Sequence, residues 1–135
     1  MKKFRDFAKN HRKLTIVIGL LYFIILGVGV FPIYNLGREW PPTLTISILS
    51  TASITYIFLG IVETSMFPKA KAYHIIPLNF VLILFSMACR YLLEYGEVSN
   101  TYNFTTPNII LHIVATMVIS TGFWIIADRT DYFIQ

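Results

Sequence analysis

Residues 14–34, "LTIVIGLLYFIILGVGVFPIY", form a continuous stretch without a charged side chain. A helix needs about 20 mostly apolar residues to cross the hydrocarbon core of a bilayer. The basic segment before it, residues 1–13, is also typical of a secretory leader, but the apolar core of a leader is only about 7–15 residues long. We therefore expect residues 14–34 to be an uncleaved membrane span rather than a leader that is removed.

Three further stretches have the length and composition of membrane spans: residues 43–66, 74–95 and 107–126. Each is predicted to be a helix, because backbone groups in lipid must find their hydrogen-bond partners within the protein. Pro42 and Pro107 suit the first turn of a helix, whereas Pro77 either kinks the third helix or marks its start. The sequence predicts one all-α integral membrane domain over residues 1–135, an antiparallel four-transmembrane-helix bundle with short loops.

The charge distribution agrees with a membrane protein. Charged residues make up 13% of the chain, whereas soluble domains carry about a quarter. Six of the eleven lysines and arginines lie in residues 1–13. A nucleic-acid-binding surface needs its basic residues spread over one face, so we expect no nucleic-acid partner.

The basic residues also predict the orientation. Basic charge precedes the first span, follows the second as Lys69 and Lys71, and follows the fourth as Arg129, whereas the other loops are mixed or acidic. The positive-inside rule places both termini and the middle loop in the cytoplasm. Aromatic residues at the predicted water interfaces are Trp40, Tyr95 and Trp124. We expect an integral, multi-pass protein of a bacterial plasma membrane.

Residues 1–13 have their own pattern. Phe4, Phe7, Ala8 and His11 would share one face of a helix, with basic residues around the rest. This predicts a short amphipathic helix on anionic lipid, and the alternative is a disordered basic tail that only fixes the topology.

Arg90 is a permanent cation near the outer end of the third span. Glu94 lies one helical turn further along, and the helical rise of about 1.5 Å per residue places His112 at a similar depth. We expect a polar cluster in the outer half of the bundle, formed by Arg90, Glu94, His112, Ser47, Ser50 and Thr51. The alternative is that Arg90 extends to the outer headgroups.

Small and hydroxyl-bearing residues recur on faces of the predicted helices. In the fourth span, Asn108, His112, Thr116 and Ser120 occur at every fourth position. Such faces let membrane helices approach closely and form hydrogen bonds with one another. We assign helix packing to Gly19, Gly27, Thr43, Thr55, Thr116 and Ser120. The alternative is a hydrated seam for a small solute or ion, completed by dimerisation.

Glu63 lies one turn from the cytoplasmic end of the second span. Lys69 and Lys71 are near enough in sequence to neutralise it, and the alternative is a carboxylate that couples to a proton or an ion. Haem ligation by His74 and His112 is excluded, because the two lie about 20 Å apart along the membrane normal. With one cysteine and no paired catalytic carboxylates or phosphate-binding loop, we expect no catalytic site, metal or cofactor.

Two classes of function fit these features. The first is a non-enzymatic protein that binds another membrane protein, as an accessory subunit, a regulator or an immunity-type protein. The second is a small homo-oligomeric transporter or channel that uses a polar seam around Arg90 and His112.

Overall fold

The computed structural model describes residues 2–32 and 41–130, which contain helices and no strand. The helices are α1 (Lys2–Asn10), α2 (Arg12–Val30), α4 (Pro42–Met66), α5 (Ala72–Leu93), α6 (Val98–Asn103) and α7 (Thr106–Arg129). Four of them, α2, α4, α5 and α7, are long and apolar enough to cross a membrane. The prediction of an all-helical, integral multi-pass protein is confirmed at this level. The predicted end of the first span and Trp40 lie outside the described residues.

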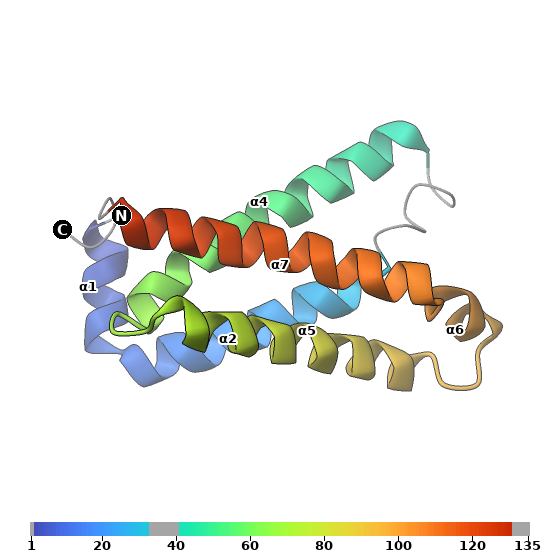
Figure 1. Cartoon of the computed structure of the whole chain (residues 1–135), viewed down its shortest axis with the longest axis horizontal. Coiled ribbons are helices and arrows are strands. Elements are labelled where there is room, and N and C mark those ends of the chain that lie inside the picture. Colours follow the sequence, from blue (N-terminus) through green and yellow to red (C-terminus); the bar gives the residue numbers. More distant parts are fainter. Residues whose placement is uncertain (1, 33–40, 131–135) are drawn as a thin grey trace.

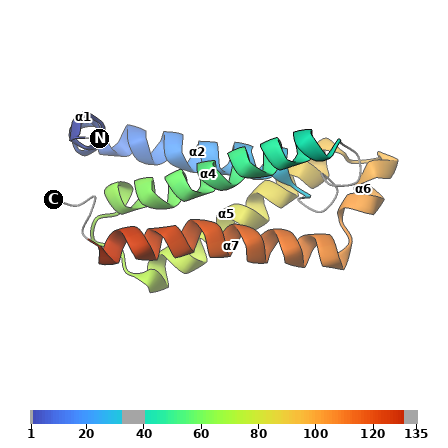
Figure 2. The ribbon, with the colours of Figure 1, turned by 90° about the horizontal axis from the view of Figure 1, so that it is seen from above.

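The four long helices lie side by side and contact one another. In Figure 1, α2 and α5 run in one direction and α4 and α7 in the other, so that α1 and the end of α7 lie at the same end of the molecule. The view from above shows α4 alongside α7 (Figure 2), and this pair shares the most extensive contact, followed by α2 with α5.

Local chemistry explains where the long helices begin. Pro42 and Pro107 occupy first-turn positions of α4 and α7, where the missing N–H costs no hydrogen bond. In α5, the Nδ1 atom of His74 accepts the backbone N–H of Lys71 at 3.2 Å, which supplies a partner for a group that the helix leaves unpaired. Helix α5 begins before Pro77 and continues through it, so Pro77 does not mark its start.

Two short helices flank the long ones. Helix α1 lies crosswise to α2 (Figure 1) and contacts both α2 and α4. Ala8 is buried there, whereas Phe7 is half-exposed. Helix α6 lies in the connection between α5 and α7. The sequence predicts this connection to be a loop. Its six residues are too few to produce a recognisable hydrophobic period.

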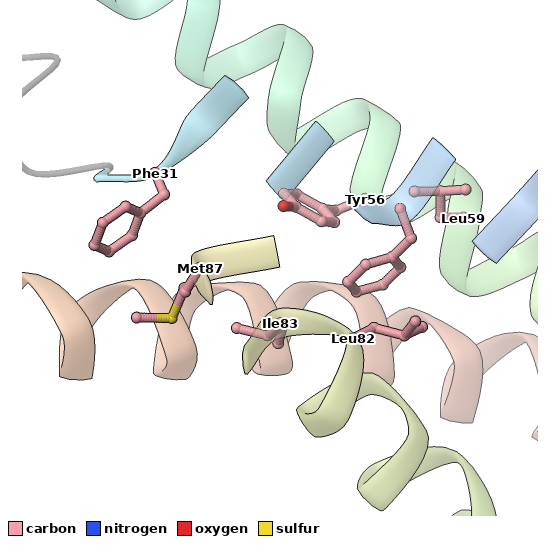
Figure 3. Packing of buried hydrophobic residues seen from close by; sticks show 7 residues of the cluster. Phe31, Tyr56, Leu59, Leu82, Ile83 and Met87 are labelled. Atoms are coloured by element: carbon pink, nitrogen blue, oxygen red, sulfur yellow. The ribbon is translucent and has the colours of Figure 1, made fainter. Parts of the chain in front are cut away.

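The apolar core forms where α2, α4 and α5 meet. Figure 3 shows buried side chains from these elements pointing toward one another. Phe23 of α2 packs edge-on against Tyr56 of α4, with ring centroids 5.5 Å apart. Ile83 of α5 is completely buried, and partly buried residues of α7 such as Ile113 and Met117 close the cluster. Because all four long helices contribute, the core fixes their rotation relative to one another.

Most of the apolar surface of the long helices faces outward. Between 22% and 33% of the residues in the most apolar window of each helix are buried. Large side chains such as Ile25, Val81 and Val118 are more than half exposed. A water-soluble monomer rarely exposes apolar patches of this extent, so hydrocarbon is the solvent that suits this surface.

Glycines permit the closest helix contacts. A Cβ atom on Gly60 of α4 would overlap the backbone carbonyl of Ser120 of α7, and one on Gly27 of α2 would overlap the side chain of Ser86 of α5. Gly19 of α2 meets the flexible side chain of Met66 in the same way. Gly19 and Gly27, assigned to helix packing, therefore lie at helix contacts, and Gly60 is a third contact that the sequence analysis did not select.

We predict that Gly60→Ala destabilises the fold, because the backbone of α7 cannot move aside locally. Inserting a methyl group into such a contact costs about 1–3 kcal/mol. Gly29→Ala is the matched control: its Cβ would meet nothing within 4 Å, and a helical Gly-to-Ala change gains about 0.5–1 kcal/mol. Free energies of unfolding in detergent micelles measure both. Equal stability of the two variants would contradict a close α4–α7 contact.

Candidate functional site

Buried polar side chains follow one face of α7 for most of its length. Asn108, His112, Thr116 and Ser120 are each no more than 4% exposed, and we call them the α7 polar row. The opposite face of α7 carries exposed apolar residues, among them Ile110, Val114 and Val118. An ionisable side chain inside a membrane helix almost always faces the protein interior, and His112 in the α7 polar row obeys this rule.

At one end of the row, three helices meet at a single amide. Asn79 of α5 is completely buried, and its Nδ2 donates to Oε2 of Glu63 of α4 at 3.3 Å. The same nitrogen lies 3.1 Å from the hydroxyl of Thr121 and 3.5 Å from that of Ser120, both of α7. We call these four residues the Glu63 cluster. It joins α4, α5 and α7 through side chains alone.

The lysines expected to neutralise Glu63 do not pair with it. Glu63 is 3% exposed, whereas Lys69 and Lys71 are exposed on the connection between α4 and α5. Among the side chains of residues 6–32 and 41–130, the ion pair that forms is that of Arg90 with Glu94. The partner of Glu63 is therefore a neutral amide, which sequence distance alone did not identify.

The middle of the α7 polar row contains groups without hydrogen-bond partners. Both ring nitrogens of His112 and the hydroxyl of Thr116 are buried and unbonded. The Tyr56 hydroxyl lies toward that of Thr116, but neither reaches hydrogen-bond geometry. Phe31 packs edge-on against the His112 ring, with centroids 5.0 Å apart. Each unbonded buried polar group costs about 1–3 kcal/mol, so these positions call for a role or for ordered water.

Arg90 lies toward the other end of the molecule and completes the end of a neighbouring helix. Its Nη1 donates to the carbonyl oxygen of Val28 of α2 at 3.0 Å. In a continuing helix that carbonyl would accept the N–H of residue 32, but residue 32 is proline and has none. The guanidinium therefore supplies the missing donor and places positive charge at the C-terminal end of α2, where the helix dipole favours it.

Glu94 holds Arg90 in this position. The Arg90 Nε donates to Oε1 of Glu94 at 2.7 Å, and the two side chains form an ion pair within α5. The other carboxylate oxygen of Glu94 accepts the Asn103 amide of α6 at 2.8 Å. Asn108 of α7 in turn donates to the carbonyl oxygen of Asn103 at 3.1 Å. This network ties α2, α5, α6 and α7 together.

The polar cluster expected around Arg90 does not form as a whole. Arg90 and Glu94 pair as expected, but His112 packs against Phe31 and bonds to neither of them. The second-span hydroxyls Ser47, Ser50 and Thr51 are exposed. The sequence gives the depth of each residue along the membrane normal. It does not give the rotation of each helix about its axis, and this rotation is why the expected cluster does not form as a whole.

Some of the residues assigned to helix packing are buried between helices, and others are exposed. Thr116 and Ser120 are buried between helices. Thr43 is exposed and Thr55 is partly exposed, with its hydroxyl bonded to the Thr51 carbonyl one turn back at 2.7 Å. Trp124, expected at a water interface, has its side chain buried at 2% exposure.

Three residues of the buried polar region were not predicted as site residues: Asn79, Thr121 and Tyr56. Asn79 carried a signal, because it is the one amide within the apolar part of the third span. Thr121 and Tyr56 carried none, since single hydroxyls are common in membrane helices. The described residues hold no group of three or more His, Cys, Asp or Glu side chains placed to bind a metal ion.

Comparison of the chain with protein-family models, with curated proteins and with solved structures finds no match in any of the three.

We predict that Arg90→Lys destabilises the fold, since one ammonium group cannot bond both the Glu94 carboxylate and the Val28 carbonyl with the geometry of a guanidinium. A lost hydrogen bond to a charged group costs about 1.5–3 kcal/mol, and partial exposure of Arg90 places the expected loss at the lower end. Unfolding in detergent measures it, with Arg129→Lys, an exposed position, as the control. Unchanged stability of Arg90→Lys would show that the Val28 contact contributes nothing.

Proposed function

We propose that this protein acts without catalysis, as an accessory subunit, regulator or immunity-type protein that binds a helix of another membrane protein. The observation that carries the proposal is the outward position of Ser47, Ser50 and Thr51 on α4, which we call the α4 hydroxyl face. Serine and threonine are enriched where membrane helices pack against one another. In this chain the α4 hydroxyl face is exposed, so a helix from outside the chain is the fitting neighbour.

The contrast with the other long helices strengthens this argument. Within the described parts of α2, α5 and α7, the exposed serine or threonine is Thr106, the first residue of α7. The hydroxyl of Thr51 donates to the carbonyl of Ser47 in its own helix at 2.8 Å. Its oxygen thus keeps lone pairs available to a donor on a partner helix, and the face tolerates lipid when no partner is bound.

We further propose that the four long helices cross the bilayer as an antiparallel bundle with both termini in the cytoplasm. The distribution of lysine and arginine over the loops supports this orientation. Helix α1, crosswise to α2 (Figure 1), is suited to lie along an anionic cytoplasmic leaflet. A bacterial plasma membrane, which is rich in anionic lipid, fits this arrangement.

We predict that Ser47→Leu/Thr51→Leu weakens association with the partner about tenfold. Each interhelical contact of this kind contributes about 0.6–2 kcal/mol, and 1.4 kcal/mol corresponds to a factor of ten. The measurement is the amount of membrane protein that co-purifies in mild detergent, followed by identification of that protein. The control is Val114→Leu/Val118→Leu on the exposed apolar face of α7, which keeps the surface apolar.

Two outcomes contradict the proposal. One is recovery of the unmodified chain alone, as a stable monomer or homodimer, under conditions that preserve membrane complexes. The other is equal recovery of the partner with both double variants. Unfolding measurements on the serine–threonine variant exclude a folding defect as the cause.

A second candidate function, a homo-oligomeric transporter or channel for a small solute or ion, has one specific observation in its favour. Polar atoms without partners lie on the α7 polar row and beside it: the two ring nitrogens of His112 and the hydroxyls of Thr116 and Tyr56. Buried polar groups of this kind are usually satisfied by ordered water. A file of water between helices is a path for protons or small ions.

For this second candidate we predict that vesicles containing the protein and a pH-sensitive dye collapse an imposed proton gradient, and that His112→Leu abolishes the flux. The leucine variant should fold with equal or higher stability, because it removes buried unbonded nitrogens. A flux that persists in His112→Leu, or tight vesicles with the unmodified protein for protons, Na⁺ and K⁺, would contradict the candidate.

A further inference from the structure

The Glu63 cluster poses a problem of charge that neither proposed function addresses. Glu63 is 3% exposed and Asn79 is not exposed at all. An ionised carboxylate buried without a paired cation is strongly unfavourable, and in practice such a group takes up a proton. The surroundings of Glu63 therefore favour its protonated carboxylic acid over its ionised carboxylate.

The described side chains around Glu63 offer it no paired cation. At this end of the molecule the described charged side chains and histidines are exposed: Asp6 and Lys9 of α1, His11, Arg12 and Lys13 at the start of α2, Lys69, Lys71 and His74 around the α4–α5 connection, and Asp128 and Arg129 of α7. The buried titratable groups Tyr56 of α4 and His112 of α7 lie about two helical turns from Glu63 and Ser120 along their own helices, and Arg90 of α5 pairs with Glu94. Arg12 contacts the end of α4, where its Nε donates to the backbone carbonyl of Met66 at 3.2 Å. No ion pair with Glu63 is formed among the side chains of residues 6–32 and 41–130.

The groups that do contact Glu63 match a neutral acid. The amide nitrogen of Asn79 donates to one carboxyl oxygen, while the amide oxygen of the same side chain is buried and has no partner. A protonated carboxyl has one O–H donor in addition to its acceptor. It pairs with an amide through two hydrogen bonds, N–H to the carboxyl C=O and O–H to the amide C=O. In that arrangement the unbonded oxygen of Asn79 accepts the carboxyl O–H, a donor that an ionised Glu63 does not have.

We infer that the Glu63 cluster is a proton-binding site, in which Glu63 is carried as a neutral carboxylic acid paired with the Asn79 amide between α4, α5 and α7. The hydroxyls of Ser120 and Thr121 orient Asn79 through its nitrogen. Loss of the proton would place an unpaired charge where three helices meet, so proton occupancy acts on the packing of all three at once. The inference stands apart from the proposed partner and from any flux.

The test is infrared spectroscopy of the whole chain in lipid nanodiscs at neutral pH. A protonated carboxyl gives a C=O stretching band above the amide band, which a carboxylate lacks. Variants at positions 63 and 94 assign the band to one carboxyl. We expect the band in the unmodified protein, its loss in Glu63→Gln, and its retention in Glu94→Gln.

One further measurement does not depend on how any variant folds, and a second tests the role of Asn79. Incorporation of glutamate labelled with ¹³C in the side-chain carboxyl should move the band to lower frequency in the unmodified chain. Asn79→Leu should move the band to higher frequency, since the carboxyl loses its amide donor, and a purely structural role for Asn79 predicts no such shift. Absence of the band from the unmodified protein, or its persistence at full intensity in Glu63→Gln, overturns the inference.

Discussion

The structure depends on one constraint: a polar group inside the hydrocarbon must find its partner within the protein. A single side chain can satisfy this constraint for several helices. The amide nitrogen of Asn79 in α5 donates to Glu63 of α4 and to Thr121 of α7. At the opposite end of the molecule, Arg90 bonds the carbonyl that Pro32 leaves without a donor. Arg12 does the same for the Met66 carbonyl at the end of α4. Polar contacts therefore fix both ends of the long helices, where the apolar core does not reach.

Close approach and polar burial support each other in this arrangement. Gly60 allows the backbone of α4 to lie directly against that of α7 at Ser120. At such a distance the short side chains of the α7 polar row are shielded from lipid on both flanks. A larger residue at position 60 would separate the helices, and Ser120 would then lose both its burial and its place beside Asn79. The hydrophobic effect contributes little to helix association within lipid, so such packing and hydrogen bonds carry more of the specificity.

Membrane spans were predictable because length and charge suffice to define them, and the four spanning helices agree with the sequence. The pairing of polar residues was not predictable, because a sequence gives the depth of a residue in the membrane but not the rotation of its helix about the helix axis. Arg90 and His112 lie at similar depth, yet Arg90 bonds to α2 and His112 packs on Phe31. Ser47 and Thr51 turn outward for the same reason. Only the side-chain volumes of the core, such as Phe23 against Tyr56, decide that rotation, and these act between segments far apart in the chain.

Polar residues on the inside and the outside of the molecule carry different information about function. The buried Asn79 and the partly buried Glu94 are accounted for by the fold, since each bonds elements that would otherwise separate. The α4 hydroxyl face contributes no bond between elements, and the Thr51 hydroxyl bonds only its own helix. Selection for folding stability alone would favour leucine or isoleucine at such lipid-facing positions, as the exposed face of α7 illustrates. Hydroxyls that the fold does not need are therefore the residues that most directly support the proposed contact with a helix of another protein.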